Sequence, residues 1–202
     1  MVTRYTGTST SGDDDSIEVA PLGCVCDDWL TIPSVIPENM FEGYKIDCHA
    51  ATKAQLARMG YKESGKRYLI ATGVYPKDPK ETYSFDYHRT EFINGVKYIK
   101  AALQKNIPVT VGIDDWDDRI KKKLKAQGKK IYVNPDGITD HFIVIVGMGT
   151  DEIGNYFLFY DNATNLPGVG VSNQNRLYCD CTKPTLSGKA DLRNPYFVGQ
   201  VG

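Results

Sequence analysis

Apolar residues recur at helical spacing in two stretches of the chain. From Thr90 to Gln104 they form one stripe, made of Phe92, Val96, Ile99 and Leu103. Apolar positions three and four residues apart lie on one face of a helix, so this stretch predicts a helix. A second helix is predicted from Cys48 to Met59, because Gly60 suits a left-handed helix end and small residues share one face at Ala50, Ala54 and Ala57.

Continuous apolar runs predict β-strands, and the strongest of them lie in the second half of the chain. These are Phe142 to Met148 and Tyr156 to Tyr160, and the polar, glycine-containing segment between them is typical of a hairpin loop. Shorter runs predict strands from Arg67 to Thr72 and from Ile107 to Ile113. Helices therefore come first and β-structure dominates later, an order that favours an α+β fold.

Composition narrows the class of protein. The chain has 202 residues, of which 41% are hydrophobic and 24% charged, and these values are typical of one globular domain with its own core. The net charge is −1, so no overall field attracts nucleic acid or an anionic membrane, and neither is expected as a partner. No apolar run approaches the roughly 18 residues that a membrane span needs.

The N-terminal end differs in character from the rest of the chain. Residues 1–16 are polar and predict a flexible linker or tail, whereas residues 17–202 predict a single domain. The polar end lacks the apolar core of a signal peptide. We therefore expect a protein that is secreted or delivered to a periplasm without a cleaved signal peptide, or one that is otherwise cytoplasmic.

Four of the five cysteines form two Cys-x-Cys pairs near opposite ends of the chain, Cys24 with Cys26 and Cys179 with Cys181. An extended segment points alternate side chains to one face, which makes the two members of a pair awkward partners for each other. Disulfides between the two pairs are therefore predicted, and they indicate an oxidising compartment. A four-thiolate zinc site and four free thiols are the alternatives.

The fifth cysteine, Cys48, stands alone at the predicted start of a helix. Unpaired N–H groups and the helix dipole stabilise a thiolate there and also favour an oxyanion that develops beside the sulfur. The alternative is a buried structural cysteine. A cysteine nucleophile needs a base, and the chain has three histidines, His49, His88 and His141. His49 would point away around the helix, and His88 has no evident partner.

His141 stands where the apolar run of a strand begins. If the two strongest strands pair so that residue numbers sum to 302, His141 lies directly across from Asp161, within hydrogen-bonding reach. A one-residue bulge would place Asn162 there instead. Either side chain would orient the imidazole, as the third member of a catalytic triad does. The alternatives are that His141 is only a polar cap for its strand, and that Asp161 ends a strand and begins a turn.

Two parts of the chain resemble papain-like cysteine peptidases. The segment from Thr139 to Gly149 resembles the family's histidine-bearing strand, and the spacing to the family's triad asparagine ends at Asp161. The segment from Leu103 to Val111 resembles the helix end and strand before it, and Asp47 to Ala50 resembles the nucleophile at a helix start. The resemblance implies a papain-like α+β fold over residues 17–202, with the nucleophile-bearing helix packed on an antiparallel β-sheet.

Two positions depart from the family's pattern. Aspartate replaces the orienting asparagine, as in bacteriocin-processing and related bacterial members. Glu42 stands six residues before Cys48, where the family has its oxyanion glutamine. A carboxylate would repel an oxyanion, so we expect the backbone N–H of Cys48 to serve with a second donor, for which Asn39 and Tyr44 are candidates.

The residues and the resemblance together predict a cysteine peptidase or amidase with the triad Cys48, His141 and Asp161, without metal or cofactor. By analogy with type VI secretion amidases, the expected substrate is the peptide part of peptidoglycan, and the expected partner is a cognate immunity protein. The alternatives are a protein-cleaving protease of the same family, a deamidase or transglutaminase-like toxin, and a catalytically inactive binding module.

Overall fold

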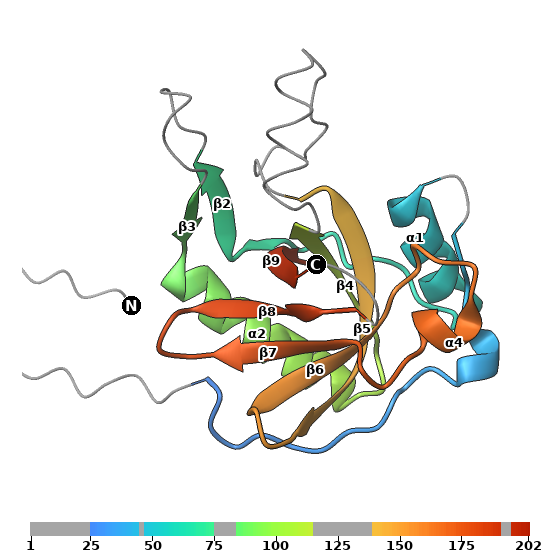
Figure 1. Ribbon diagram of the computed structural model, residues 1–202, viewed down its shortest axis with the longest axis horizontal. Helices are drawn as coiled ribbons and strands as arrows, with labels where there is room; N and C mark the ends of the chain where they lie inside the picture. The colour runs from blue at the N-terminus through green and yellow to red at the C-terminus, as the bar shows by residue number, and fades with distance from the viewer. Residues whose placement is uncertain (1–24, 45–46, 75–83, 115–138, 191–194) are drawn as a thin grey trace, which may run out of the picture.

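The computed structural model describes residues 25–44, 47–74, 84–114, 139–190 and 195–202 (Figure 1). Residues 1–16 and Cys24, for which a tail and a disulfide are predicted, lie outside this part. The helices are η1 (Glu38–Met40), α1 (Cys48–Arg58), α2 (Arg89–Leu103) and α4 (Pro167–Gly170). The strands are β1 (Tyr68–Leu69), β2 (Ala71–Val74), β3 (Ser84–Tyr87), β4 (Val109–Asp114), β5 (His141–Thr150), β6 (Asn155–Tyr160), β7 (Arg176–Asp180), β8 (Thr185–Lys189) and β9 (Pro195–Val201).

The main sheet of the described residues closes on itself. Its strand order is β1-β9-β4-β5-β6-β7-β8, and a further pairing joins β8 to β9. Strands β4 to β9 therefore form a six-stranded barrel in which every pairing is antiparallel. β1 extends the sheet beside β9, and β2 and β3 form a separate hairpin that projects from the barrel (Figure 1).

The predicted α+β, papain-like fold, with the nucleophile-bearing helix packed on an antiparallel β-sheet, is wrong, because the described part of the chain is mostly β and its sheet is a closed barrel. No strand is predicted from the sequence after Tyr160. β7 and β8 give no clear strand pattern, because most of their residues are only partly buried and their apolar runs are short. Closure of the barrel also requires β9 to pair with β4. Val111 of β4 pairs with Val201 of β9, 90 positions later, and no local sequence pattern predicts such a pairing.

Side chains that alternate along the strands fill the barrel. Val109, Val111 and Ile113 of β4 share a buried cluster with Ile143 and Ile145 of β5. The predicted stripe of α2 joins the same cluster, and its four members Phe92, Val96, Ile99 and Leu103 are almost fully buried. The helix prediction for this stretch is confirmed.

Helix α1 lies against the outer side of β5, where Leu56 packs with Val144 and Val146 in a second cluster (Figure 1). The helix itself is as predicted, and Gly60 after it has a φ of 78°. Its predicted small face is wrong, since the buried residues are Ala51, Thr52, Gln55 and Leu56. Within the described residues no helix has the length and hydropathy of a membrane span.

Candidate active site

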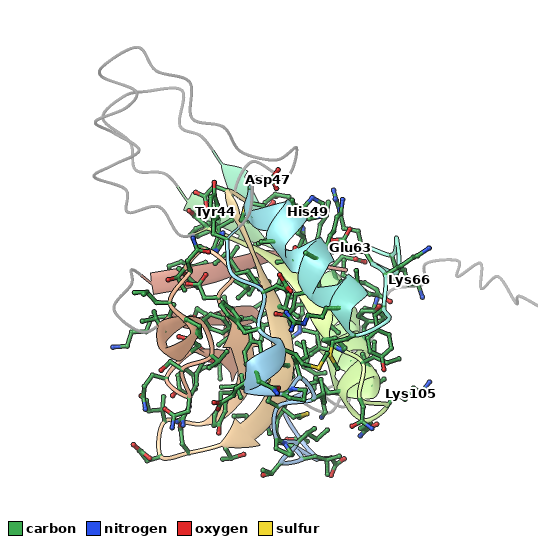
Figure 2. The ribbon with its side chains drawn as sticks, turned by 90° about the vertical axis from the view of Figure 1, so that its right-hand side faces the viewer. Tyr44, Asp47, His49, Glu63, Lys66 and Lys105 are labelled. Atoms are coloured by element: carbon green, nitrogen blue, oxygen red, sulfur yellow. A yellow bond between two sulfur atoms is a disulfide. The ribbon has the colours of Figure 1, made fainter. Side chains whose placement is uncertain are left out.

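Cys48 is the first residue of α1, at the end of the helix that Figure 2 marks with Asp47 and His49. Asp47 is the N-cap, and its Oδ1 accepts a hydrogen bond of 2.7 Å from the backbone N–H of Ala50. This cap fixes the helix start. Cys48 is a free thiol and only partly buried.

His141 and Asp161 form a buried pair beside this helix end. His141 is the first residue of β5 and Asp161 directly follows β6. The distance from His141 Nε2 to Asp161 Oδ1 is 3.1 Å. The side chains are 5% and 0% exposed, so water does not weaken this interaction.

A β-bulge decides that Asp161, and not Asn162, faces the imidazole. Near the turn, Thr150 pairs with Asn155, but the register shifts by one between Ile145 and Gly147. After the shift Val144 pairs with Tyr160, so the predicted register, which sums to 302, is wrong. The observed register, continued by one residue, places Asp161 opposite Ile143, on the same face as His141 and diagonal to it. Aspartate and histidine are long enough to meet across that diagonal.

Asp161 is held from several directions. The Tyr196 hydroxyl donates to its Oδ2 at 3.0 Å, and the backbone N–H of Ala163 donates to its Oδ1 at 3.0 Å. The backbone N–H of Asp161 donates to the Gly170 carbonyl at 2.9 Å. Tyr196 belongs to β9 and is fully buried. The sequence did not reveal its role, because β9 was not predicted and no local pattern links Tyr196 to Asp161, 35 positions earlier.

The thiol of Cys48 is activated by its surroundings. Partial burial alone would raise its pKa, but a hydrogen bond with His141, the charge of that residue and the N–H groups of Phe142 and His49 together lower the pKa below its ordinary value. Since Nε2 of His141 faces Asp161, Nδ1 is the nitrogen left for the sulfur. The thiolate is therefore stabilised by one imidazole and two backbone donors.

The pKa of His141 moves in the opposite direction. Burial disfavours the charged imidazolium, but the hydrogen bonds to Asp161 and Cys48, with the charges of both, raise the pKa to about 9. The buried carboxylate thus favours the protonated ring, and the protonated ring favours the thiolate form of Cys48.

The other described cysteines lie together elsewhere and lack this activation. Cys26 and Cys181 form a disulfide, one of the predicted cross-pairings. The remaining thiol, Cys179, has a pKa that burial raises to about 12. Of the two free thiols in the described residues, Cys48 alone has a lowered pKa.

Asn162, the alternative orienting residue, contacts a different part of the protein. Its Nδ2 donates to the Glu42 carbonyl at 2.5 Å and to Gln55 Oε1 at 3.5 Å. Gln55 in turn accepts from the backbone N–H of Glu42 and donates to the carbonyl of Met40. Asn162 therefore fastens the segment before Cys48 to α1 and β6.

Glu42 and the two candidate oxyanion donors, Tyr44 and Asn39, lie in different parts of the segment before α1. Glu42 Oε1 forms an ion pair of 2.5 Å with Arg58 Nη1, near the C-terminal end of α1. The carboxylate is thus engaged away from the helix start. Tyr44 is half-exposed, and Figure 2 labels it toward the same end of α1 as Asp47. Asn39 lies in η1.

The two remaining histidines take no part in the pair. His49 stacks on Phe142 with ring centroids 4.4 Å apart, and its Nε2 lies 2.7 Å from Glu63 Oε1. Its expected orientation away from Cys48 agrees with these contacts. His88 does have a partner, Thr72 Oγ1 at 3.0 Å.

A cavity of about 90 Å³ lies on the outer side of the barrel wall. Its lining includes His49 and Phe142, together with Thr110, whose buried Oγ1 has no hydrogen-bond partner. Alternate residues of a strand face opposite sides, so Phe142 points away from His141. The cavity is separate from the Cys48–His141 pair.

Comparisons with known proteins add no relative: no protein-family model, curated protein or solved structure matches this chain. The resemblance to papain-like peptidases therefore depends on the short segments around Cys48, Leu103 to Val111 and His141.

Proposed function

We propose that this protein is a cysteine hydrolase that cleaves amide bonds through Cys48, His141 and Asp161. The observation that carries the proposal is the continuous chain of interactions from the partly buried Cys48 to the buried imidazole and on to the buried carboxylate. A merely structural cysteine needs neither an imidazole partner nor a lowered pKa. Together the three groups have the roles of nucleophile, base and orienting residue.

In the first half of the reaction the thiolate of Cys48 attacks the carbonyl carbon of the amide. The bond to nitrogen breaks, and His141 donates its Nδ1 proton to the departing amine. The carbonyl oxygen becomes an oxyanion beside the start of α1, where the N–H groups of the first helical turn favour negative charge. The product that remains is a thioester of Cys48.

In the second half the neutral imidazole removes a proton from water. The hydroxide adds to the thioester, the carbon–sulfur bond breaks, and the thiolate and the imidazolium return together. Asp161 holds the ring in one orientation through both halves and stays ionised. Neither half requires a metal or a redox cofactor.

The substrate part of the proposal is supported by resemblance. The segments around Cys48 and His141 resemble papain-like bacterial peptidases, and peptides of peptidoglycan are proposed as the substrate by analogy with type VI secretion amidases. An enzyme of that kind acts in a periplasm and has a cognate immunity protein that blocks its site. The described disulfide agrees with an oxidising compartment.

Alkylation tests the catalytic pair directly. Because the pKa of Cys48 is lowered, iodoacetamide at pH 6 should label it faster than an ordinary thiol, by about 10-fold or more. His141→Ala should abolish that advantage, whereas His88→Ala, which removes a histidine outside the pair, should retain it. Peptide mass spectrometry identifies the labelled cysteine. If Cys48 reacts no faster than a free thiol, the enzyme proposal fails.

Digestion of purified peptidoglycan tests the substrate. Mass spectrometry of the muropeptides should show new amino termini with the wild-type protein and none with Cys48→Ala. Unchanged muropeptides, with cleavage of an unfolded protein substrate in parallel, would replace the cell-wall substrate by protein. Release of ammonia from glutamine without chain cleavage would instead identify a deamidase.

A further inference from the structure

Three cysteine sulfur atoms, none of them that of Cys48, lie close together in the fold. Cys26 comes from the segment before η1, Cys179 from β7 and Cys181 from the residue that follows β7. All three Sγ atoms lie within 4.8 Å of one another. Cys26 Sγ lies 2.8 Å from Cys179 Sγ and is bonded to Cys181. Because 155 positions separate Cys26 from Cys181, the fold itself assembles this cluster.

A structural disulfide uses two cysteines, and within the described residues Cys179 lies beside this one as a free thiol. Cys179 and Cys181 are alternate residues of an extended segment, so their side chains point to one side. A tetrahedral zinc ion binds thiolates at about 2.3 Å, which places its sulfur ligands about 3.8 Å apart. The 4.8 Å limit on the cluster is compatible with that spacing after small side-chain rotations.

Burial raises the pKa of Cys179, but a backbone donor and a positive charge lie beside the cluster. The backbone N–H of Cys26 donates to Cys181 Sγ at 3.3 Å, a contact of the kind that supports the ligands of metal sites. The ammonium group of Lys100 donates to the carbonyls of Val25 at 3.3 Å and Asp27 at 2.8 Å, on both sides of Cys26. These bonds hold the loop in place and bring a positive charge near the sulfurs.

We propose that the reduced cluster binds one zinc ion through Cys26, Cys179 and Cys181, and that the Cys26–Cys181 disulfide is the metal-free oxidised form of the same site. Soft thiolate ligands select zinc over magnesium or calcium. The described residues supply three ligands to a tetrahedral ion, which takes four. The site is independent of the proposed hydrolase activity, since it shares no residue with the triad.

Conversion between the two forms balances with a phosphine as the reductant. The phosphine and one water become a phosphine oxide, and the disulfide becomes two thiols. Zinc then replaces the protons of three thiols, which pass to the buffer. The charge of the ion does not change, so the redox step concerns sulfur alone.

Metal titration of the folded protein tests the proposal. After reduction by a phosphine and removal of the reductant under anaerobic conditions, the protein should take up one equivalent of cobalt with thiolate-to-cobalt absorption. Zinc should then displace the cobalt. The oxidised protein should bind neither ion. If the reduced wild-type protein fails to take up zinc, the proposal is wrong.

Cys179→Ala is the decisive variant, because it leaves the disulfide intact and its folding can be checked in the oxidised state. Loss of a supporting contact weakens metal binding by about 10- to 100-fold, so loss of a ligand should weaken zinc binding by at least about 100-fold. The matched control Cys48→Ala removes a thiol outside the cluster and should bind zinc as the wild-type protein does. Full binding by Cys179→Ala, or its loss in Cys48→Ala, would overturn the assignment.

Discussion

At the residue scale, the candidate site depends on a buried carboxylate that is held in place before any substrate arrives. Asp161 is fully buried, and a buried carboxylate is stable only where donors compensate for the lost water. His141 and Tyr196 are two of these donors, one on each carboxylate oxygen. The charge of Asp161 then acts on Cys48 through the imidazole between them.

Tyr196→Phe tests this support. Removing a hydrogen bond to a charged group costs about 1.5–3 kcal/mol, so we expect kcat to fall by roughly 10- to 100-fold and the pKa of His141 to change. The matched control is Tyr178→Phe, which removes a similar hydroxyl bond to Asp151 away from the site. A pH–rate profile of each variant provides the measurement. Equal losses in both variants would mean that Tyr196 has a structural role only.

Asp161→Asn tests the electrostatic coupling. The amide carries no negative charge, while burial continues to disfavour the imidazolium, so the pKa of His141 should fall from about 9 toward or below its ordinary value of 6.5. The pKa of Cys48 should rise in response, because its positive partner is lost at lower pH. NMR of the imidazole and the pH dependence of alkylation report the two shifts. Asp151→Asn is the control, and an unchanged profile in Asp161→Asn contradicts the coupling.

At the element scale, the short helix α4 positions the residue that orients the histidine. The Gly170 carbonyl accepts from the backbone N–H of Asp161 at 2.9 Å and from the side chain of Asn175 at 3.1 Å. Gly170 also lies against the ring of Phe41, which contacts Tyr160 edge-on with centroids 5.9 Å apart. A side chain at position 170 has no room.

Gly170→Ala should therefore destabilise the fold. Overpacking of a tight contact costs about 1–3 kcal/mol, and the displaced carbonyl should also reduce activity. Gly168→Ala is the matched control in the same helix, because a methyl group there meets nothing within 4 Å. Urea unfolding of both variants measures the difference in the free energy of unfolding. Equal stabilities would contradict the assigned contact with Phe41.

At the scale of the whole molecule, the Cys26–Cys181 disulfide joins the first described segment to the end of β7. A bond across 155 positions restricts the unfolded chain strongly, and native disulfides contribute about 2–4 kcal/mol. Cys26→Ser removes the sulfur that is bonded to Cys181 and lies 2.8 Å from Cys179 Sγ, so it should lower the free energy of unfolding of the oxidised protein by that amount in the presence of a chelator. Cys48→Ser, which breaks no disulfide, is the control. A wild-type protein whose stability does not respond to reductant would contradict the prediction.

Much of the local structure is predictable because it depends on neighbouring residues. The stripe of Phe92 and its partners and the apolar run after His141 are periodic signals, and α2 and β5 lie within about one or two residues of the predicted bounds. The strand predicted from Arg67 to Thr72 is instead divided at Ile70, whose N–H and carbonyl bond to Gly199 and His88. A partner outside the local sequence determines such a break.

The sequence by itself determined the order of Cys48, His141 and Asp161 along the chain, the helix that begins at Cys48 and the strand that begins at His141, since capping and periodicity are local properties. Tertiary structure decided the rest. The bulge between Ile145 and Gly147 turned Asp161 instead of Asn162 toward the ring, and β9 brought Tyr196 to the carboxylate. Closure of the barrel also depends on β4 pairing with β9. Each of these outcomes is a pairing between distant segments, whose free energy no single stretch of residues contains.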